Sequence, residues 1–275
     1  MRWTSAVNWD IAERGEFGGI HISRLQQFPE IKPMAGEKAD VAILKAMSQN
    51  RIRTIFAENN LWTVLWVLLY WDQIFAKIPG SYEPLFGPFF PIQGHDIPQN
   101  LFQGNFYDSH RDFFKRRRSE LEQTDLVTEI LKGQQKSKHA WTRLLEDGDK
   151  FRPGEIEEAL RMLPREGVLR VLDRLWMDYN ENRRGLPDLL VLEPEIALVE
   201  VKGPKDRLTK KQAEWLRYLV IKCEIIGEVL VIGWTDKKLS NLERMLLGKK
   251  NQYNIKKQKR RLRQRKHPKR YQNLM

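Results

Sequence analysis

The stretch Gly185-Leu-Pro-Asp188-Leu-Leu-Val-Leu-Glu-Pro-Glu-Ile-Ala-Leu-Val-Glu200-Val-Lys202-Gly203 decides the fold of this chain. It holds two apolar runs, 189–192 and 196–201, which flank a turn-like Glu-Pro-Glu, and this pattern predicts a β-hairpin. If the turn is the centre of the hairpin, Asp188 lies opposite Glu200, and residues of equal parity share one face. Lys202 returns to that same face. We therefore expect one apolar face and one face that carries a site.

The charges on this hairpin need a cation. Directly opposed residues have Cβ atoms about 4.5–5.5 Å apart, so two carboxylates there repel each other and weaken the pairing. A divalent metal between Asp188 and Glu200 removes that repulsion. Two carboxylates that hold a hard cation such as Mg²⁺, beside a lysine, are suited to phosphodiester hydrolysis. The alternative is an edge strand that carries its charges outward as protection against aggregation.

These residues resemble a known nuclease signature. Pro187-Asp188 with Glu200-Val201-Lys202 is similar to the PD-(D/E)xK motif, and the run 199–216 is similar to its VRR-NUC branch, most of all to the Fanconi-associated nucleases. The resemblance implies an α/β fold, a restriction-endonuclease-like mixed β-sheet flanked by helices and preceded by a helical segment. It also implies that the Val201 carbonyl completes the metal shell, that Lys202 orients a water or neutralises the transition state, and that Gln212 supports it.

The apolar run 61–76 precedes that motif. It is too short for the ~20 residues that a bilayer requires, so we expect a buried helix of a globular domain. Glu58 stands at its start, where a negative charge is favourable for any helix. The run is also similar to the family helix that begins with Glu-Gly, although Asn59 replaces the glycine here. That resemblance implies that Glu58 is a third metal ligand.

The net charge of +12 is concentrated at one end. Residues 249–275 contain twelve Lys and Arg and no acidic residue, so the rest of the chain is balanced. We expect this tail to act in nuclear localisation or in DNA or RNA binding, with a steep dependence on salt. Further candidate phosphate contacts lie near the hairpin, at Lys205, Arg207, Lys210 and Lys211. Arg116 and Arg117 belong to a cluster that serves equally well as a solvated helix face.

The order of elements predicts four segments. They are an irregular or helical lead-in (1–50), a helical region that contributes Glu58 (51–150), the VRR-NUC core (151–236), and a helix with a disordered basic tail (237–275). Helices are predicted over 38–48, 61–76, 108–131, 155–163, 166–179, 210–222 and 240–248, with a polar break at 133–138 and a third strand at 229–234. The single cysteine, Cys223, excludes an internal disulfide and a cysteine-based zinc cluster, which favours a reducing compartment.

The leading hypothesis is a metal-dependent DNA nuclease that uses one or two Mg²⁺ or Mn²⁺ ions. The resemblance implies branched or 5′-flapped DNA as substrate, 5′–3′ exonuclease activity, a role in interstrand crosslink repair, and the nucleus as location, or the cytoplasm in a bacterium. The alternatives are a Holliday-junction-type resolvase and a catalytically silent nucleic-acid-binding module. The chain is too short for the family's zinc finger, SAP domain and most of its helical repeats. We therefore expect a reduced member or a fragment, without ubiquitin-dependent recruitment and without a membrane partner.

Overall fold

The computed structural model describes residues 2–6, 9–25, 38–58, 60–76, 98–102, 106–138, 142–146 and 151–247. Its centre is a six-stranded sheet with strand order β1-β2-β6-β5-β4-β3. The strands are β1 (Ile11–Phe17), β2 (Ile20–Leu25), β3 (Thr54–Phe56), β4 (Leu189–Val191), β5 (Ala197–Lys202) and β6 (Ile226–Ile232). The β2–β6 and β6–β5 pairs are parallel, and the other pairs are antiparallel. The predicted mixed sheet is confirmed.

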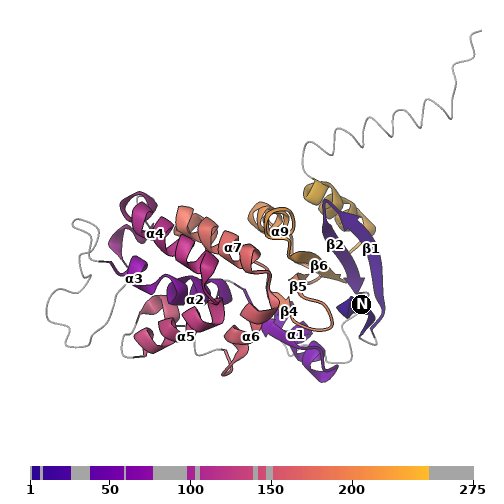
Figure 1. The fold of residues 1–275 in the computed structure, drawn as a ribbon. Helices are drawn as coiled ribbons and strands as arrows, with labels where there is room; N and C mark the ends of the chain where they lie inside the picture. Colours follow the sequence, from indigo (N-terminus) through magenta and orange to yellow (C-terminus); the bar gives the residue numbers. More distant parts are fainter. Residues whose placement is uncertain are drawn as a thin grey trace, which may run out of the picture.

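Helices cover both faces of this sheet and form a separate group beside it (Figure 1). They are α1 (Ala39–Gln49), α2 (Asn60–Leu69), α3 (Trp71–Ile74), α4 (Phe106–Gln123), α5 (Leu126–Ser137), α6 (Glu155–Met162), α7 (Arg165–Met177), α8 (Tyr179–Asn182) and α9 (Lys210–Cys223). Residues 236–247 are also helical. Short 3-10 helices lie at Trp3–Ser5 (η1), Gln99–Phe102 (η3) and Arg143–Leu145 (η4).

The central strands are buried on both faces because each face has its own helix. Val199 and Val201 of β5 pack with Ile43 and Met47 of α1 on one face. On the other face, Leu198 packs with the helical core, to which α9 also contributes. Strands that are covered on both faces have sequences that are nearly continuous apolar runs. The expectation of one apolar face and one site face is therefore wrong for most of the hairpin, and the site is confined to the strand ends.

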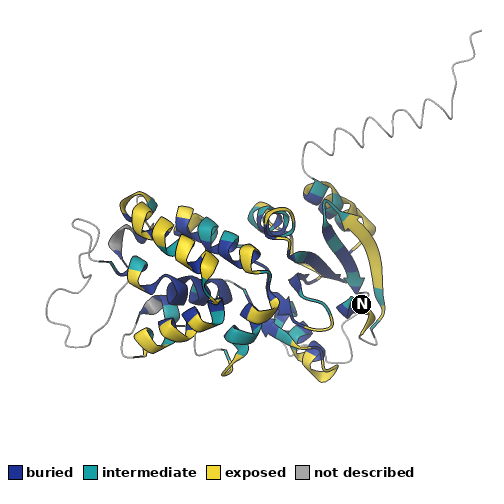
Figure 2. Ribbon diagram, viewed as in Figure 1, coloured by how far each residue is buried: buried dark blue, intermediate teal, exposed yellow. Residues whose placement is uncertain are grey.

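Helix α2 forms the centre of the helical group. Eight of its residues are buried, including Trp62 and Trp66, and Figure 2 shows this helix almost entirely in the buried colour. Helix α2 ends at Leu69 and the short helix α3 begins at Trp71, so the predicted single helix is interrupted at Tyr70. In the described parts of the chain, no helix is both long enough and apolar enough for a membrane span.

Several predictions about elements are wrong. The helix predicted over 108–131 is two helices, because α4 ends at Gln123 and Asp125 caps α5. The expected irregular lead-in holds β1 and β2, and β2 pairs with β6 along its whole length. The expected polar break at 133–138 lies almost wholly within α5, where Gly133 packs against the Leu68 carbonyl. The last helix begins at residue 236 rather than at 240. The basic tail from residue 249 on, and its predicted disorder, lie outside the described residues.

Candidate active site

The strand register brings the two hairpin carboxylates together. Leu189 of β4 pairs with Val199 of β5, so the next pair outward is Asp188 and Glu200, as the symmetric turn predicts. Both side chains share a face with Leu190 and Leu198, which are fully buried in the helical core. The site thus begins where the apolar packing of that face ends.

Backbone hydrogen bonds fix Asp188 between two strands. Its carbonyl oxygen accepts from the N–H groups of Ala57 and Glu58, at 2.8 and 3.0 Å, and these bonds place the start of α2 beside it. Its Oδ2 accepts from the Val201 N–H at 2.8 Å. The N–H and C=O of one strand residue face the same neighbouring strand. The Val201 carbonyl therefore also faces Asp188, and its role as a ligand stays a prediction.

Glu200 is fully buried and has one engaged oxygen. Its Oε1 receives the Lys202 ammonium at 2.5 Å and the Gln212 amide at 2.6 Å. Gln212 is itself held by a capping box, because its Oε1 accepts from the Thr209 N–H at 2.9 Å. In contrast, Glu200 Oε2 has no hydrogen-bond partner among the described residues. An unsatisfied carboxylate oxygen in the interior is costly unless a cation or a proton meets it.

The electrostatics of this pair follow from burial. Burial disfavours the charged form of both carboxyl groups and raises the pKa of Asp188 to about 6 and that of Glu200 to about 8. The nearby Asp188 charge adds to the shift at Glu200, and Lys202 opposes it. Burial lowers the pKa of Lys202, but the attraction of Glu200 outweighs it and the pKa is raised overall. Lys202 therefore stays charged near neutral pH.

Asp40 joins this site, and sequence reasoning missed it. One carboxylate oxygen from each of Asp40, Glu58 and Asp188 lies within 4.8 Å of the others. Two full charges at that separation repel by about 3.5 kcal/mol at an effective dielectric of about 20. An acidic residue in the first turn of a helix is stabilised by only about 0.3–1 kcal/mol, which is less than this repulsion. The signal at Asp40 was weak because any acidic residue in a first helical turn looks the same in sequence.

The residues at this site fit a hard divalent cation. Carboxylate and carbonyl oxygens are the ligands that Mg²⁺ and Mn²⁺ take in proteins, and this site offers several together. The fit is supported by the orphaned, fully buried Oε2 of Glu200 and by the three clustered carboxylates. The ligand assignments to Glu58, Asp188, Glu200 and Val201 stay predictions. The geometry nevertheless brings Glu58, Asp188, Glu200, Lys202 and Gln212 to one place.

Four of the predicted phosphate contacts border the site. Lys205 and Arg207 are exposed on the loop that joins β5 to α9. Lys210 and Lys211 begin α9, where Lys211 contacts Glu181 at 3.1 Å and Lys210 lies 3.6 Å from Glu214. These pairs are exposed, so they are weak and can give way to phosphate groups. The position of this cluster is consistent with the predicted role.

Arg116 and Arg117 lie elsewhere, on α4. Helix α7 separates α4 from α9 (Figure 1). Arg117 donates to Glu129 at 2.6 Å, to Glu120 at 3.1 Å and to the Leu69 carbonyl at 2.9 Å, so its guanidinium ties helices together. The Arg116 guanidinium lies 5.0 Å from the centre of the Phe113 ring. The structure therefore does not bring these two residues to the carboxylates.

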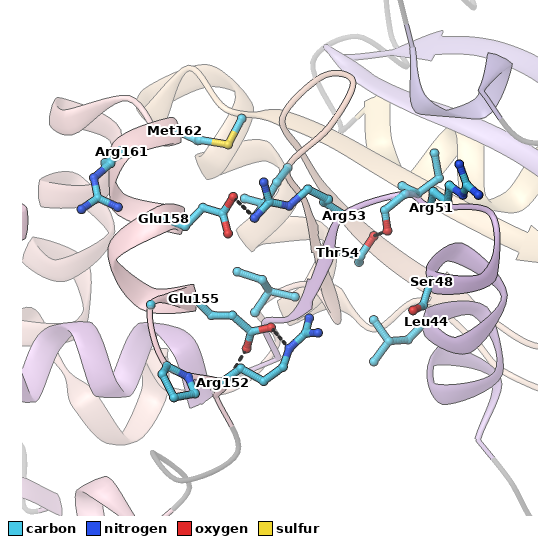
Figure 3. A pocket seen from close by; sticks show the side chains of 15 residues that line it. Leu44, Ser48, Arg51, Arg53, Thr54, Arg152, Glu155, Glu158, Arg161 and Met162 are labelled. Carbon is cyan, nitrogen blue, oxygen red and sulfur yellow. Dashed lines mark hydrogen bonds and ion pairs between the residues drawn. The ribbon is translucent and has the colours of Figure 1, made fainter.

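A cavity of about 880 Å³ lies between α1, β3 and α6, away from the carboxylates. Figure 3 shows two of its arginines turned toward acidic residues of α6. Arg53 pairs with Glu158, and Arg152 pairs with Glu155 at 2.6 Å. The site carboxylates and Lys202 do not line this cavity. Its charges largely satisfy one another, so we assign it no chemistry.

Comparison with known proteins agrees with this geometry. Residues 121–231 match the VRR-NUC domain. This part of the chain is therefore similar to VRR-NUC domains, and Asp188, Glu200 and Lys202 have the spacing of a PD-(D/E)xK motif. Over about 60% of its length the chain is, more particularly, similar to Fanconi-associated nuclease 1 homologs. It is 33% identical over 171 residues to the Fanconi-associated nuclease 1 homolog of Pseudomonas aeruginosa, and 30% identical over 166 residues to that of Caenorhabditis elegans.

The structural comparison extends further along the chain. The crystal structure of paFAN1 bound to 2nt 5′flap DNA with gap is similar to 81% of this chain, with a TM-score of 0.65 and 26% identity. The match covers 39% of that chain. The two sequence relatives match over 59% and 58% of this chain, and over 28% and 18% of their own lengths. The chain thus matches less than a third of the length of these curated relatives.

Proposed function

We propose that this chain is a structure-specific DNA nuclease that hydrolyses phosphodiester bonds with Mg²⁺ or Mn²⁺. The observation that carries the proposal is the buried Asp188–Glu200 pair, with Lys202 on Glu200 and with Glu58 next to Asp188. The similarity to paFAN1 bound to 5′-flap DNA supports a flapped or branched DNA substrate. We extend the proposal to 5′–3′ exonuclease activity and a role in crosslink repair from the resemblance to the Fanconi-associated nucleases. The nucleus is the expected location in a eukaryote, and the cytoplasm in a bacterium.

The site residues divide into two roles. Glu58, Asp188 and Glu200, with the Val201 carbonyl, would hold one or two ions, which lower the pKa of a bound water and neutralise charge on the phosphate. Lys202 holds a permanent positive charge at the buried end of β5, where it can orient the attacking water or meet the developing charge. Gln212 fixes the Glu200 carboxylate through its amide.

The surrounding cations and the tail supply affinity rather than chemistry. Lys205, Arg207, Lys210 and Lys211 would contact backbone phosphates near the scissile bond, since charge neutralisation dominates nucleic-acid affinity. We retain Arg116 and Arg117 as contacts of a more distant part of the duplex. Arg116 is the more accessible of the two, because Arg117 is engaged with Glu129.

Cleavage of labelled DNA tests the proposal. Wild type should cut a 5′-flap duplex with Mg²⁺ or Mn²⁺, and Asp188→Ala and Lys202→Ala should reduce the rate by at least about 10²-fold. Lys222→Ala, on the exposed side of α9, is the matched control and should cut normally. Binding of DNA by wild type without any cutting would mean a silent binding module. Preferential cutting of four-way junctions would mean a resolvase.

A further inference from the structure

Asp40 is an acidic residue that the nuclease motif does not include. It lies in the first turn of α1 and is only 8% exposed. Its carboxylate lies within 4.8 Å of those of Glu58 and Asp188, and the Asp40 charge is one of the influences that raise the pKa of Asp188. No described Lys, Arg or His forms an ion pair with it. Three carboxylates from three different parts of the chain therefore meet, and among the described residues Lys202 is the cation whose charge acts on Asp188.

The packing of α1 holds Asp40 at this position. Ile43 and Met47 are fully buried against β5, on the face of the sheet opposite to Glu200. Asp40 therefore reaches Asp188 around the end of the strands, from the other side of the sheet. Gly203 permits this approach, because a Cβ at that position would lie 3.3 Å from the Cβ of Ala39. The residue that follows β5 is thus small where α1 begins.

A second observation also points to a ligand at this place. Glu200 is fully buried, and its Oε2 has no hydrogen-bond partner in the part of the chain that the structure describes. It lies opposite Asp188 in the hairpin, and the charges of both Asp188 and Glu58 act on it. An interior carboxylate oxygen without a donor is costly unless a proton or a cation meets it, and a metal ion held by the neighbouring carboxylates would meet it. The unpartnered Oε2 of Glu200 is therefore evidence for a ligand at the site that does not depend on the Asp40 cluster.

We propose that Asp40 is an additional metal-binding residue, which completes the acidic set from the opposite side of the sheet together with Glu58 and Asp188. The inference deepens the proposed nuclease function and rests on it. With Asp40 the site draws ligands from α1, from the start of α2 and from both strands of the hairpin. Metal binding would therefore fasten α1 to the strand ends as well as fill the site.

Binding of Mn²⁺ to the purified full chain without DNA tests this proposal. Isothermal titration calorimetry should give wild type a measurable Kd, and Asp40→Asn should raise that Kd by about tenfold or more, because fewer charged ligands remain. Asp108→Asn is the matched control. Asp108 also lies in the first turn of a helix, α4, but it is exposed and pairs with Arg111. This variant should bind Mn²⁺ as wild type does.

Thermal unfolding separates a ligand from a helix-capping charge. If Asp40 binds metal, Asp40→Asn should unfold at an equal or higher temperature than wild type in EDTA, because a repulsion is removed, and should gain less from Mn²⁺. A lower Tm in EDTA, together with a wild-type Mn²⁺ Kd, would mean that Asp40 only stabilises α1 and would overturn the proposal. The nuclease function would survive if Asp188→Asn still lost Mn²⁺ binding. Absence of Mn²⁺ binding by wild type would overturn both.

Discussion

At the scale of single residues, the site combines buried charge with a fixed arrangement of partners. The carboxyl groups of Asp188 and Glu200 have pKa values of about 6 and about 8, against 3.8 and 4.5 for ordinary Asp and Glu. A raised pKa means that the folded state prefers the protonated acid. Ionisation therefore costs stability progressively as pH rises from about 4.5 to about 8. A bound divalent ion would stabilise the ionised carboxylates and so offset this loss of stability.

The pH dependence of stability checks this reasoning. In EDTA, wild type should lose stability relative to Glu200→Gln between pH 5 and pH 8, by on the order of 1 kcal/mol or more. The comparison cancels other titrating groups, such as His110, whose pKa burial lowers. Urea denaturation at several pH values provides the measurement. The affinity for Mn²⁺ should rise over the same range, since the ion displaces protons. A constant difference between the two proteins would contradict the raised pKa of Glu200.

Gln212 links the start of α9 to Glu200, and its two bonds can be separated. Gln212→Ala removes both the capping box and the amide bond to Glu200, whereas Thr209→Ala removes only the hydroxyl of the cap. Both variants should lose about 1 kcal/mol of stability. Only Gln212→Ala should also lower the cleavage rate, by about 10–100-fold, because Glu200 loses a positioning donor. Equal rates for the two variants would restrict Gln212 to a capping role.

At the scale of elements, close backbone contacts hold the helical group together. A Cβ at Gly133 of α5 would lie 2.2 Å from the carbonyl oxygen of Leu68 in α2, so the two helices touch at backbone distance. The Gly133→Ala substitution must therefore push α5 and α2 apart. We expect a loss of about 2–4 kcal/mol in the free energy of unfolding, in the range of other overpacked cores. Gln135→Ala, on the exposed side of α5, should cost less than about 0.5 kcal/mol.

The same glycine shows why part of the fold escaped sequence reasoning. Gly133 and the polar residues after it look like a helix break, yet the glycine is needed for contact with α2, and α5 continues to Ser137. The contact joins residues far apart in sequence, so local propensity cannot reveal it. In contrast, the register of Asp188 and Glu200 could be predicted, because the turn and the alternation of side chains fix it within nineteen residues of chain.

The N-terminal strands and Asp40 were missed for a related reason. β1 is largely exposed and contains Gly15, so it lacks the apolar alternation that marks a strand. β2 gains its stability from parallel pairing with β6, about two hundred residues further along the chain. Asp40 becomes part of the site only through the packing of α1 on β5. Each of these features depends on a distant partner, which one sequence does not reveal.

At the scale of the whole molecule, both ends of the described chain meet on the same sheet. The buried Trp3 donates its indole N–H to Glu228 of β6 at 2.8 Å, and Arg2 contacts the same carboxylate at 3.0 Å. Leu239, Leu242 and Leu246 of the last helical segment pack with β2. Strands β2 and β6, which lie beside β5, are thus packed by residues from both ends of the described chain. Residues 249–275, which hold the excess positive charge, lie outside the described residues.

The twelve cations of that tail should dominate affinity for DNA but not the chemistry. Removal of 249–275 should weaken binding and make the slope of log K against log salt shallower, by roughly 5 if half of the cations contact phosphates. Cleavage at saturating DNA should stay within about twofold of wild type, because the carboxylates and Lys202 lie in the remaining chain. A variant with glutamine in place of the twelve cations separates charge from length. If that variant keeps the wild-type slope, or if the deletion abolishes cleavage at saturation, the tail acts on the site itself rather than by charge.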